Sequence, residues 1–380
     1  MKPRLILPLL AASAACLASA RDYVALLGTY TGSAATDSRG IYAVRLNAET
    51  GALTAPELVA ELSNPEFLAL HPGGKVVYAL TQVPAAGGKK AGAVAAFTLD
   101  AGAVRLTPLN VESSGRGQFC HLAVDATGGM VVAASYGDPY VASFPLAADG
   151  RVGKVANVLD QSGPLGPQKP RQDAPHPHSV TLSPDNRFAF VANLGVDRVF
   201  AYELAPESGG LAPHDPAFTP IAPGAGPRHT KFSPEANSFY VLDELDNTVT
   251  ACRYDAVRGI VEPFQSISTL PDDFAGKSTA SEIRVHPNGR FVYSANRGHN
   301  SIAVFARDAA SGALVQVEIV PTGGQQPRNF ALTPDGAWLL CANQATNNLT
   351  VFKVDARTGR LTPTPHTAHV SKAVCVLFLP

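Results

Sequence analysis

The chain has 380 residues, of which 46% are hydrophobic and 16% are charged. This composition supplies a packed core and excludes an intrinsically disordered protein. Glycine and proline together make up about 17% of the residues, above the roughly 12% of average proteins, so we expect many turns. The 30 basic and 31 acidic residues nearly cancel, which excludes the basic surface of a nucleic-acid-binding protein.

The first twenty residues differ from the rest of the chain. Lys2 and Arg4 precede an apolar stretch over residues 5–17, which is followed by Ala-Ser-Ala at residues 18–20. This order is typical of a secretory signal peptide, so we expect residues 1–20 to be removed and the protein to be periplasmic or secreted. A membrane anchor is disfavoured because the apolar stretch is short and rich in alanine. A lipoprotein signal at Cys16 remains a minor alternative.

Removal of this segment takes away two of the 30 basic residues and none of the 31 acidic ones, which leaves a net charge of −3. No later apolar run reaches the roughly 18 residues of a spanning helix, so we predict no membrane span. The four remaining cysteines form no C-x-x-C pair and no metal-ligand spacing, and we predict neither a metal nor a cofactor. An exported protein permits a disulfide, but the sequence assigns none.

A repeat recurs through the remaining chain. Segments 179–193 (SVTLSPDNRFAFVAN), 282–296 (EIRVHPNGRFVYSAN) and 329–343 (NFALTPDGAWLLCAN) each contain an alternating strand, a turn and a second strand, which is the pattern of a β-hairpin. Three weaker copies bring the number to six. Their turn residues lie roughly 47 to 58 residues apart, near the period of four-stranded propeller repeats, and are Pro72, Ala126, Pro184, Pro234, Pro287 and Pro334.

The two ends of the chain supply a seventh unit. Residues 372–380 (KAVCVLFLP) resemble the first strand of the hairpin, and residues 23–31 (YVALLGTYT) resemble the second. Pairing them would close the ring and remove free sheet edges. We therefore predict an all-β fold, a single seven-bladed β-propeller domain over residues 21–380, with four antiparallel strands per blade and a C-terminal strand that pairs with the N-terminal one.

Charged residues gather at one end of these hairpins. The residue six positions before each turn residue and the residue ten positions after it are expected to face each other across the hairpin, so that His178 opposes Leu194, Arg228 opposes Glu244 and Arg328 opposes Gln344. Since the first strand of a propeller blade lines the central channel, these side chains should converge at one mouth. Positions selected in this way include Glu66, His178, Arg228, Glu244, Arg297 and Arg328.

Several motifs resemble a known family. APHPHSVTLSPDNRFAFVANLGVDRVFAYEL, GPRHTKFSP, LDELDNTV, ASEIRVHPNGRFVYSANRGHNSIAVF and GGQQPRNFALTPDG occur in this order, after GTYT at 28–31 and GIY at 40–42. They are similar to the lactonase family of seven-bladed propellers, whose members include 6-phosphogluconolactonase and a fungal carboxy-cis,cis-muconate cyclase. The resemblance covers the whole chain after the signal and implies a carboxylic ester hydrolase of the lactonase type.

Lactone hydrolysis needs a base for water, a cationic donor for the oxyanion and an acid for the leaving hydroxyl. His178 and Glu244 suit the proton transfers, and Arg228 and Arg297 suit the oxyanion or an anionic substrate group. The resemblance implies the same four catalytic residues. With no G-x-S-x-G or H-E-x-x-H motif in the chain, direct hydrolysis by activated water is favoured over an acyl-serine.

Four further residues are candidates for substrate binding: Arg328, His229, Glu282 and Glu66. His229 follows Arg228 in the same strand, so we expect its side chain on the opposite face of the sheet. Glu282 belongs either to the site or to a salt bridge between blades. The long proline-rich loop over residues 161–178 is expected to cover the mouth, with His176 exposed on it.

Two functions remain open at this point. The first is a lactonase, or a lactone-forming cyclase, that acts on an acidic sugar lactone or a related dicarboxylate; a small molecule would then be its partner and the protein a monomer. The second is a non-catalytic exported propeller that binds a protein or glycan, since propellers serve many functions.

Overall fold

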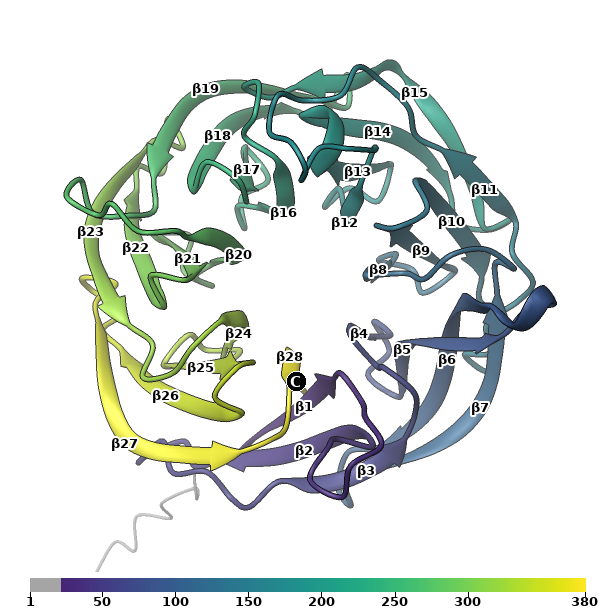
Figure 1. Cartoon of the computed structure of the whole chain (residues 1–380), viewed down its shortest axis with the longest axis horizontal. Helices are drawn as coiled ribbons and strands as arrows, with labels where there is room; N and C mark the ends of the chain where they lie inside the picture. The colour runs from purple at the N-terminus through teal and green to yellow at the C-terminus, as the bar shows by residue number, and fades with distance from the viewer. Residues whose placement is uncertain (1–21) are drawn as a thin grey trace, which may run out of the picture.

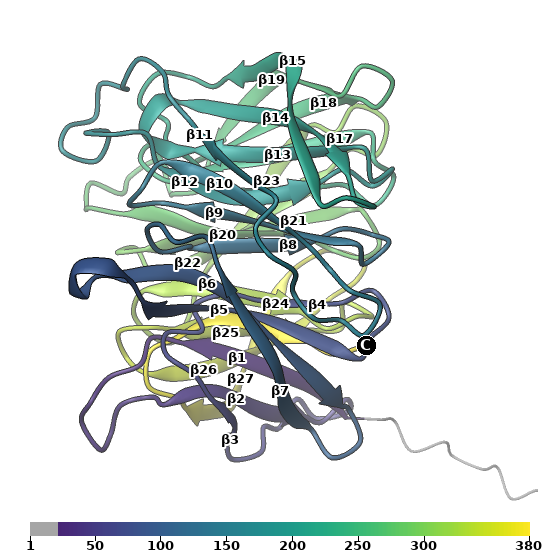
Figure 2. The same ribbon diagram turned by 90° about the vertical axis from the view of Figure 1, so that its right-hand side faces the viewer.

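The computed structural model describes residues 22–380, so the expected signal peptide at residues 1–20 lies outside the described residues. Seven four-stranded sheets stand around one axis (Figure 1), and every strand pair within them is antiparallel. Seen from the side, most strands run across the thickness of the ring (Figure 2). The predicted all-β propeller of seven four-stranded blades is therefore confirmed.

The strands fall into four sets according to their place in the sheet, counted outward from the axis. The innermost strands are β4 (Leu68–Leu70), β8 (His121–Val124), β12 (Pro177–Leu182), β16 (Pro227–Phe232), β20 (Thr279–Val285), β24 (Pro327–Leu332) and β28 (Ala373–Phe378). The second strands are β1 (Tyr23–Thr29), β5 (Val76–Pro84), β9 (Met130–Ser135), β13 (Phe188–Asn193), β17 (Ser238–Asp243), β21 (Phe291–Arg297) and β25 (Trp338–Asn343).

The third and outermost strands complete each blade. The third strands are β2 (Gly40–Leu46), β6 (Lys90–Asp100), β10 (Tyr140–Pro145), β14 (Arg198–Ala205), β18 (Thr248–Asp255), β22 (Ser301–Arg307) and β26 (Asn348–Val354). The outermost strands are β3 (Glu57–Glu61), β7 (Arg105–Ser113), β11 (Asn157–Asp160), β15 (Gly210–Pro220), β19 (Ile260–Ser268), β23 (Leu314–Pro321) and β27 (Leu361–His369). Two short 3-10 turns, η1 (Ala86–Gly88) and η2 (Leu194–Val196), complete the described elements.

The ends of the chain close the ring as the sequence predicts. The C-terminal strand β28 pairs antiparallel with β1, from Ala25 opposite Phe378 to Thr29 opposite Ala373. Figure 1 shows the yellow C-terminal strand beside the purple N-terminal one. Blade one is therefore built from both ends of the chain. Because β28 pairs with β1, the inner edge of β1 is not left unpaired.

The core lies between neighbouring blades. Second strands such as β13 and β17 are buried at every residue, because both of their faces pack against adjacent sheets. Three of these strands carry a tyrosine whose hydroxyl donates a hydrogen bond to the carbonyl of a turn glycine in the next blade: Tyr78 to Gly150 at 2.9 Å, Tyr240 to Gly312 at 2.8 Å and Tyr293 to Gly359 at 2.9 Å. The repeat thus aligns blades by a buried polar contact as well as by apolar packing.

The expected hairpin register was wrong at the start of the innermost strands, where the predicted site residues lie. Arg228 does not pair with Glu244; instead Pro227 lies opposite Asp243 and His229 opposite Leu242. The same shift separates His178 from Leu194 and Arg328 from Gln344. Two offsets cause this difference. Next to the turn the strands are already one residue out of the expected register, since Phe232 lies opposite Phe239. A β-bulge between Pro227 and His229 then sets two residues of the inner strand against one of its partner and adds a second offset.

Candidate active site

A cavity of about 460 Å³ opens where the innermost strands begin. Five of the eight predicted site residues line it: Glu66, His178, Glu244, Arg297 and Arg328. Arg228 and His229 line a smaller space that continues from this cavity along the axis. Glu282 lines neither space, because its side chain is fully buried farther along β20.

Glu244 is the centre of the charged cluster. Its Oε2 lies 2.9 Å from Nε of Arg228, and its Oε1 lies 3.0 Å from Nη2 of Arg297 and 2.6 Å from Nη2 of Arg171. Glu244 and Arg228 are each 2% exposed, so the ion pair between them is barely screened by water, whereas the Arg171 side chain is partly exposed. The three arginines come from a loop and from two different blades, and one carboxylate holds them together.

This cluster fixes the protonation state of Glu244. Burial alone would raise the pKa of its carboxyl group, but the positive charges of Arg297 and Arg228 hold that pKa well below its usual range. For Arg228, burial and the charge of Arg297 lower the guanidinium pKa to about 9. Glu244 is therefore an anion at neutral pH and a weak proton acceptor.

The backbone around Glu244 explains its position between blades. Its amide donates to the carbonyl of Gly226 at 2.8 Å, and its carbonyl accepts from the amide of Ala280 at 3.2 Å. Gly226 has a φ of 69°, and a Cβ there would meet the Leu245 side chain. A glycine thus permits the tight turn that brings the start of β16 against the residue that follows β17.

Histidines continue from the site along the axis. Nε2 of His178 lies 3.9 Å from Oε2 of Glu244, and its ring centroid lies 5.4 Å from that of His229. The prediction that His229 points away from the site was wrong, because the bulge at Arg228 and His229 directs both side chains into the same space. Burial and the charge of Arg228 hold the pKa of both histidines well below 6.5, so both rings are neutral at neutral pH.

Glu282 lies outside both spaces and connects neighbouring blades. Its Oε1 lies 3.2 Å from Nδ1 of His229 in the neighbouring blade, and its Oε2 lies 3.5 Å from Nη2 of Arg284 on its own strand. Asn329 from the next blade donates a further hydrogen bond to it. These contacts join three blades beneath the cavity, and they make Glu282 a support for His229.

A second carboxyl group in the cavity, that of Glu66, has a raised pKa, in contrast to Glu244. Burial raises the pKa of Glu66 to about 7, although the charge of Arg328 and a hydrogen bond from Tyr30 lower it in part. Arg328 lies over the Tyr30 ring, with its guanidinium carbon 5.4 Å from the ring centroid. Beside them, burial and the nearby Glu66 raise the pKa of the Cys120 thiol to about 12, so this thiol is not a ready nucleophile.

The loop over residues 161–176 contributes Arg171 to this cavity. Gln172, which is fully buried, anchors it by donating to Oδ1 of Asp197 and to the carbonyl of Leu194, both at 2.8 Å. The expectation of an exposed His176 was wrong. His176 is 8% exposed, and its ring stacks on that of Tyr136 at 4.2 Å between centroids, so it holds the loop against the blade that contains β9.

Sequence reasoning missed Arg171, Tyr30 and Tyr136 as parts of the cavity. Tyr136 occupies a hairpin position that the repeat selects, but it carries no charge and was passed over. Arg171 belongs to a loop that has no counterpart in the other blades, so the repeat gives no signal for it. Its position within the long proline-rich loop was the only indication that the sequence offered.

Three other properties concern the described residues as a whole. Within residues 22–380 no helix has the length and apolar character needed to cross a bilayer. The same residues contain no cluster of three or more histidine, cysteine, aspartate or glutamate side chains placed to hold a metal ion. Cys120, Cys252, Cys341 and Cys375 are free thiols, so none of the disulfides that the sequence permits is formed among them.

Comparison with known proteins gives a consistent result. The model of the family described as lactonase, 7-bladed beta-propeller, matches residues 24–378. A 6-phosphogluconolactonase from Bacillus subtilis is 38% identical over 94% of this chain and 98% of its own length, and one from Formosa agariphila is 30% identical over 77% and 82%. The structure of a periplasmic gluconolactonase from Pseudomonas aeruginosa superposes with a TM-score of 0.87 at 32% identity, covering 95% of this chain and 99% of the other.

Proposed function

Because the chain belongs to the lactonase family of seven-bladed β-propellers, we propose that it hydrolyses a sugar-acid lactone that carries an anionic group, at the cavity around Glu244. The observation that carries this proposal is the charge of the cavity. Four arginines, at positions 171, 228, 297 and 328, face one fully ionised carboxylate and one partly ionised carboxylate. The excess positive charge suits a phosphate or carboxylate on the substrate.

Water is the nucleophile in this proposal, and Glu66 is its base. The pKa of Glu66, about 7, matches the requirement that a base be partly ionised at neutral pH, whereas Glu244 is too weak an acceptor. As the water oxygen bonds to the lactone carbonyl carbon, one water proton moves to Glu66. When the tetrahedral intermediate collapses, the bond to the ring oxygen breaks and the same proton passes to that oxygen, which yields the open hydroxy acid.

The other predicted residues take supporting roles. Arg297 and Arg171 face the cavity and supply N–H donors to the oxyanion, which need little reorganisation because Glu244 already fixes them. Glu244 is then the anchor of the arginines, while Arg328 holds the anionic group of the substrate. His178, whose Nδ1 is buried without a partner among the described residues, is free to bond a substrate hydroxyl.

The direct test measures lactone hydrolysis by the purified protein on 6-phosphogluconolactone, gluconolactone and muconolactone, with spontaneous hydrolysis subtracted. We expect Glu244→Gln to lower kcat by about 100-fold, a loss typical of removing preorganised oxyanion stabilisation. Glu262→Gln on the exposed face of β19 is the matched control and should keep full activity. Equal rates for protein, variant and buffer across the panel would reject the lactonase and favour the non-catalytic binding protein.

The same panel tests the substrate class. Arg328 and the excess positive charge predict a higher kcat/KM for 6-phosphogluconolactone than for gluconolactone, by at least about tenfold. Arg328→Met should reduce that preference more than it reduces the rate on gluconolactone. A protein that hydrolyses both lactones equally well would still be a lactonase, but the proposal of an anionic substrate would be wrong.

We further propose that the protein acts outside the cytoplasm. The signal peptide expected over residues 1–20 supports this location, and one similar structure is that of a periplasmic gluconolactonase. Fractionation of the producing cells followed by mass determination should find a chain that begins at Arg21 in the exported fraction. Full-length protein confined to the cytoplasm would contradict the proposal without affecting the proposed reaction.

A further inference from the structure

A second cavity, of about 630 Å³, lies at the other end of the axis from the candidate active site. It is lined by the final residues of the seven innermost strands, whereas the candidate active site lies where those strands begin. Phe67 lines this cavity and also the narrow space beside His229, so its ring lies between the two ends. None of the predicted catalytic residues lines this second cavity.

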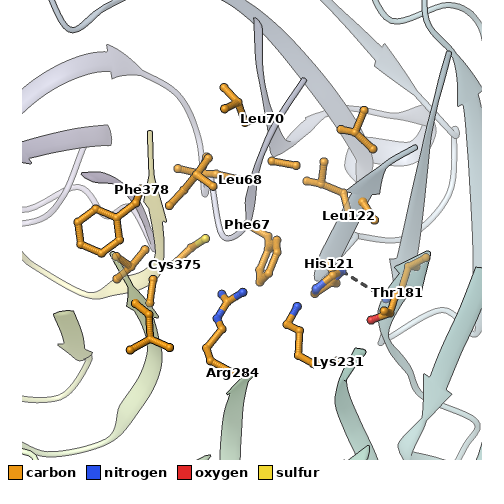
Figure 3. A pocket seen from close by; sticks show the side chains of 18 of the residues that line it. Phe67, Leu68, Leu70, His121, Leu122, Thr181, Lys231, Arg284, Cys375 and Phe378 are labelled. Carbon is orange, nitrogen blue, oxygen red and sulfur yellow. Dashed lines mark hydrogen bonds between the residues drawn. The ribbon is translucent and has the colours of Figure 1, made fainter. Parts of the chain in front are cut away.

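The walls of this cavity are mostly apolar. Leu68, Leu70, Leu122 and Phe378 surround the opening in Figure 3, and no aspartate or glutamate is among the residues that line it. A concave apolar surface of this size is typical of small-molecule sites, in which a few polar groups fix the orientation of the ligand.

Two cations lie at the base of the cavity. Figure 3 shows Lys231 from β16 and Arg284 from β20 side by side, with their charged ends directed toward Phe67. Within residues 22–380, the Lys231 ammonium makes no hydrogen bond or ion pair. Arg284 donates from Nε to the carbonyl of Phe330 at 3.1 Å, and its contact with Glu282 is long, at 3.5 Å.

The nearest carboxylate, Glu282, offsets only one of these two positive charges. Glu282 is fully buried, and it is already engaged by His229, Asn329 and the amide of Ile283. Burial and the charge of Arg284 lower the pKa of Lys231 to about 8, so the ammonium is still mostly charged at pH 7. His121, which also lines the cavity, is neutral there because burial and His229 lower its pKa well below 6.5.

We propose that this second cavity binds a small carboxylic acid with an apolar body, whose carboxylate lies between Lys231 and Arg284. An ammonium and a guanidinium placed together supply the charge-assisted donors that a carboxylate accepts. The leucines and Phe378 then bury the apolar part of the ligand, which inorganic anions cannot exploit. This site is separate from the proposed lactone site and does not depend on it.

Octanoate is the probe, measured by isothermal titration calorimetry on the purified protein at pH 7, with octanol and inorganic phosphate as comparison ligands. We expect octanoate to bind at least tenfold more tightly than either. Lys231→Met should weaken octanoate binding by tenfold or more, and Lys231→Arg should restore most of it. Lys75→Met, which removes an exposed lysine outside the cavity, is the matched control and should bind as the unaltered protein does.

Protons give a second readout. Because a bound carboxylate favours the charged ammonium, binding at pH 8 should take up protons, and this uptake should vanish in Lys231→Met. Titration in two buffers of different ionisation enthalpy measures it. Absence of octanoate binding, equal binding by Lys231→Met, or phosphate binding as tight as octanoate would each overturn the proposal. Thermal unfolding of each variant verifies that the propeller is intact.

Discussion

The two carboxyl groups in the candidate active site, Glu244 and Glu66, differ in pKa because different numbers of arginines form ion pairs with them. Glu244 has three guanidinium groups within 3.0 Å and stays ionised. Glu66 is half-buried, and no basic side chain forms an ion pair with it among the described residues, so desolvation prevails and raises its pKa to about 7. Environments that separate the pKa values of two carboxyl groups in this way are a common basis for distinct acid–base roles.

The proposed base has a testable pH dependence. Only the ionised form of Glu66 accepts a proton, so kcat/KM should fall about tenfold per pH unit below pH 7 and level off above it. Glu66→Gln should lower kcat/KM by about 100-fold and remove this limb. Initial rates between pH 5 and 8, corrected for spontaneous hydrolysis, measure the profile. A flat profile in the unaltered protein, or the same limb in Glu66→Gln, would assign the base elsewhere.

Glu244 also has a predicted effect on stability. Glu244→Ala leaves Arg228 charged and buried without its partner, which in other proteins costs about 3–5 kcal/mol. We expect a loss of this size in the free energy of unfolding, measured by chemical denaturation. The matched change Glu262→Ala on the exposed face of β19 should cost less than about 0.5 kcal/mol. Equal effects of the two substitutions would show that the arginine cluster does not depend on its carboxylate.

At the scale of elements, the loop over residues 161–176 is held by short contacts with the η2 turn. Gly195 lies directly beneath it, and a Cβ on this residue would overlap the carbonyl oxygen of Ala174. The loop can therefore approach β13 only because residue 195 is glycine. Through Gln172 and its neighbour Arg171, this approach determines where one of the oxyanion donors lies.

Gly195→Ala should thus displace the loop and Arg171. We expect KM for the preferred lactone to rise by about tenfold while the protein stays folded, because the substitution moves a positioning segment and leaves the strands intact. Steady-state kinetics on the lactone panel measure the change. Gly102→Ala, at a turn where a Cβ meets only an aspartate oxygen at 3.4 Å, is the control. Unchanged KM in Gly195→Ala would mean that Arg171 does not act on the substrate.

Elements with a counterpart in every blade were predictable, and the others were not. The Pro-Asp-Gly type turns and the alternating strands placed Glu66, His178 and Arg328 at one mouth, because the repeat fixes both the fold and the strand ends. The direction of His229 was not predictable, since a bulge depends on packing between blades and leaves no regular mark in a single strand. Arg171 lies in a unique loop and was missed for that reason.

At the scale of the whole molecule, the ring has two ends with different chemistry. One end has arginines arranged around Glu244, and the other has an apolar cavity with Lys231 and Arg284. Both ends are formed by the same seven innermost strands, one of which is the C-terminal strand β28. Val376 and Phe378 of this strand line the second cavity, so closure of the ring and completion of that cavity are one event.

Removal of β28 should therefore open the molecule. A chain that ends at residue 372 loses the pairing with β1 and exposes the apolar faces of Ala25 and Leu27. We expect it to lose cooperative thermal unfolding and to associate during size-exclusion chromatography, because a long unpaired apolar edge promotes aggregation. A chain that lacks only the exposed Pro380 is the control and should behave as the full protein does. Cooperative unfolding of the shorter chain would show that six blades suffice.

The pairing of the first strand with the last also determines when folding can finish. At ribosomal rates of roughly 5–20 residues per second, the time between synthesis of β1 and synthesis of β28 is roughly 20–70 s. During that interval the apolar strand YVALLGT has no inner partner. Blades two to seven can assemble while the chain is still growing, but blade one cannot. Protection of the newborn N-terminal strand is thus a requirement that this architecture places on the cell, and it ends only when the final residues are released.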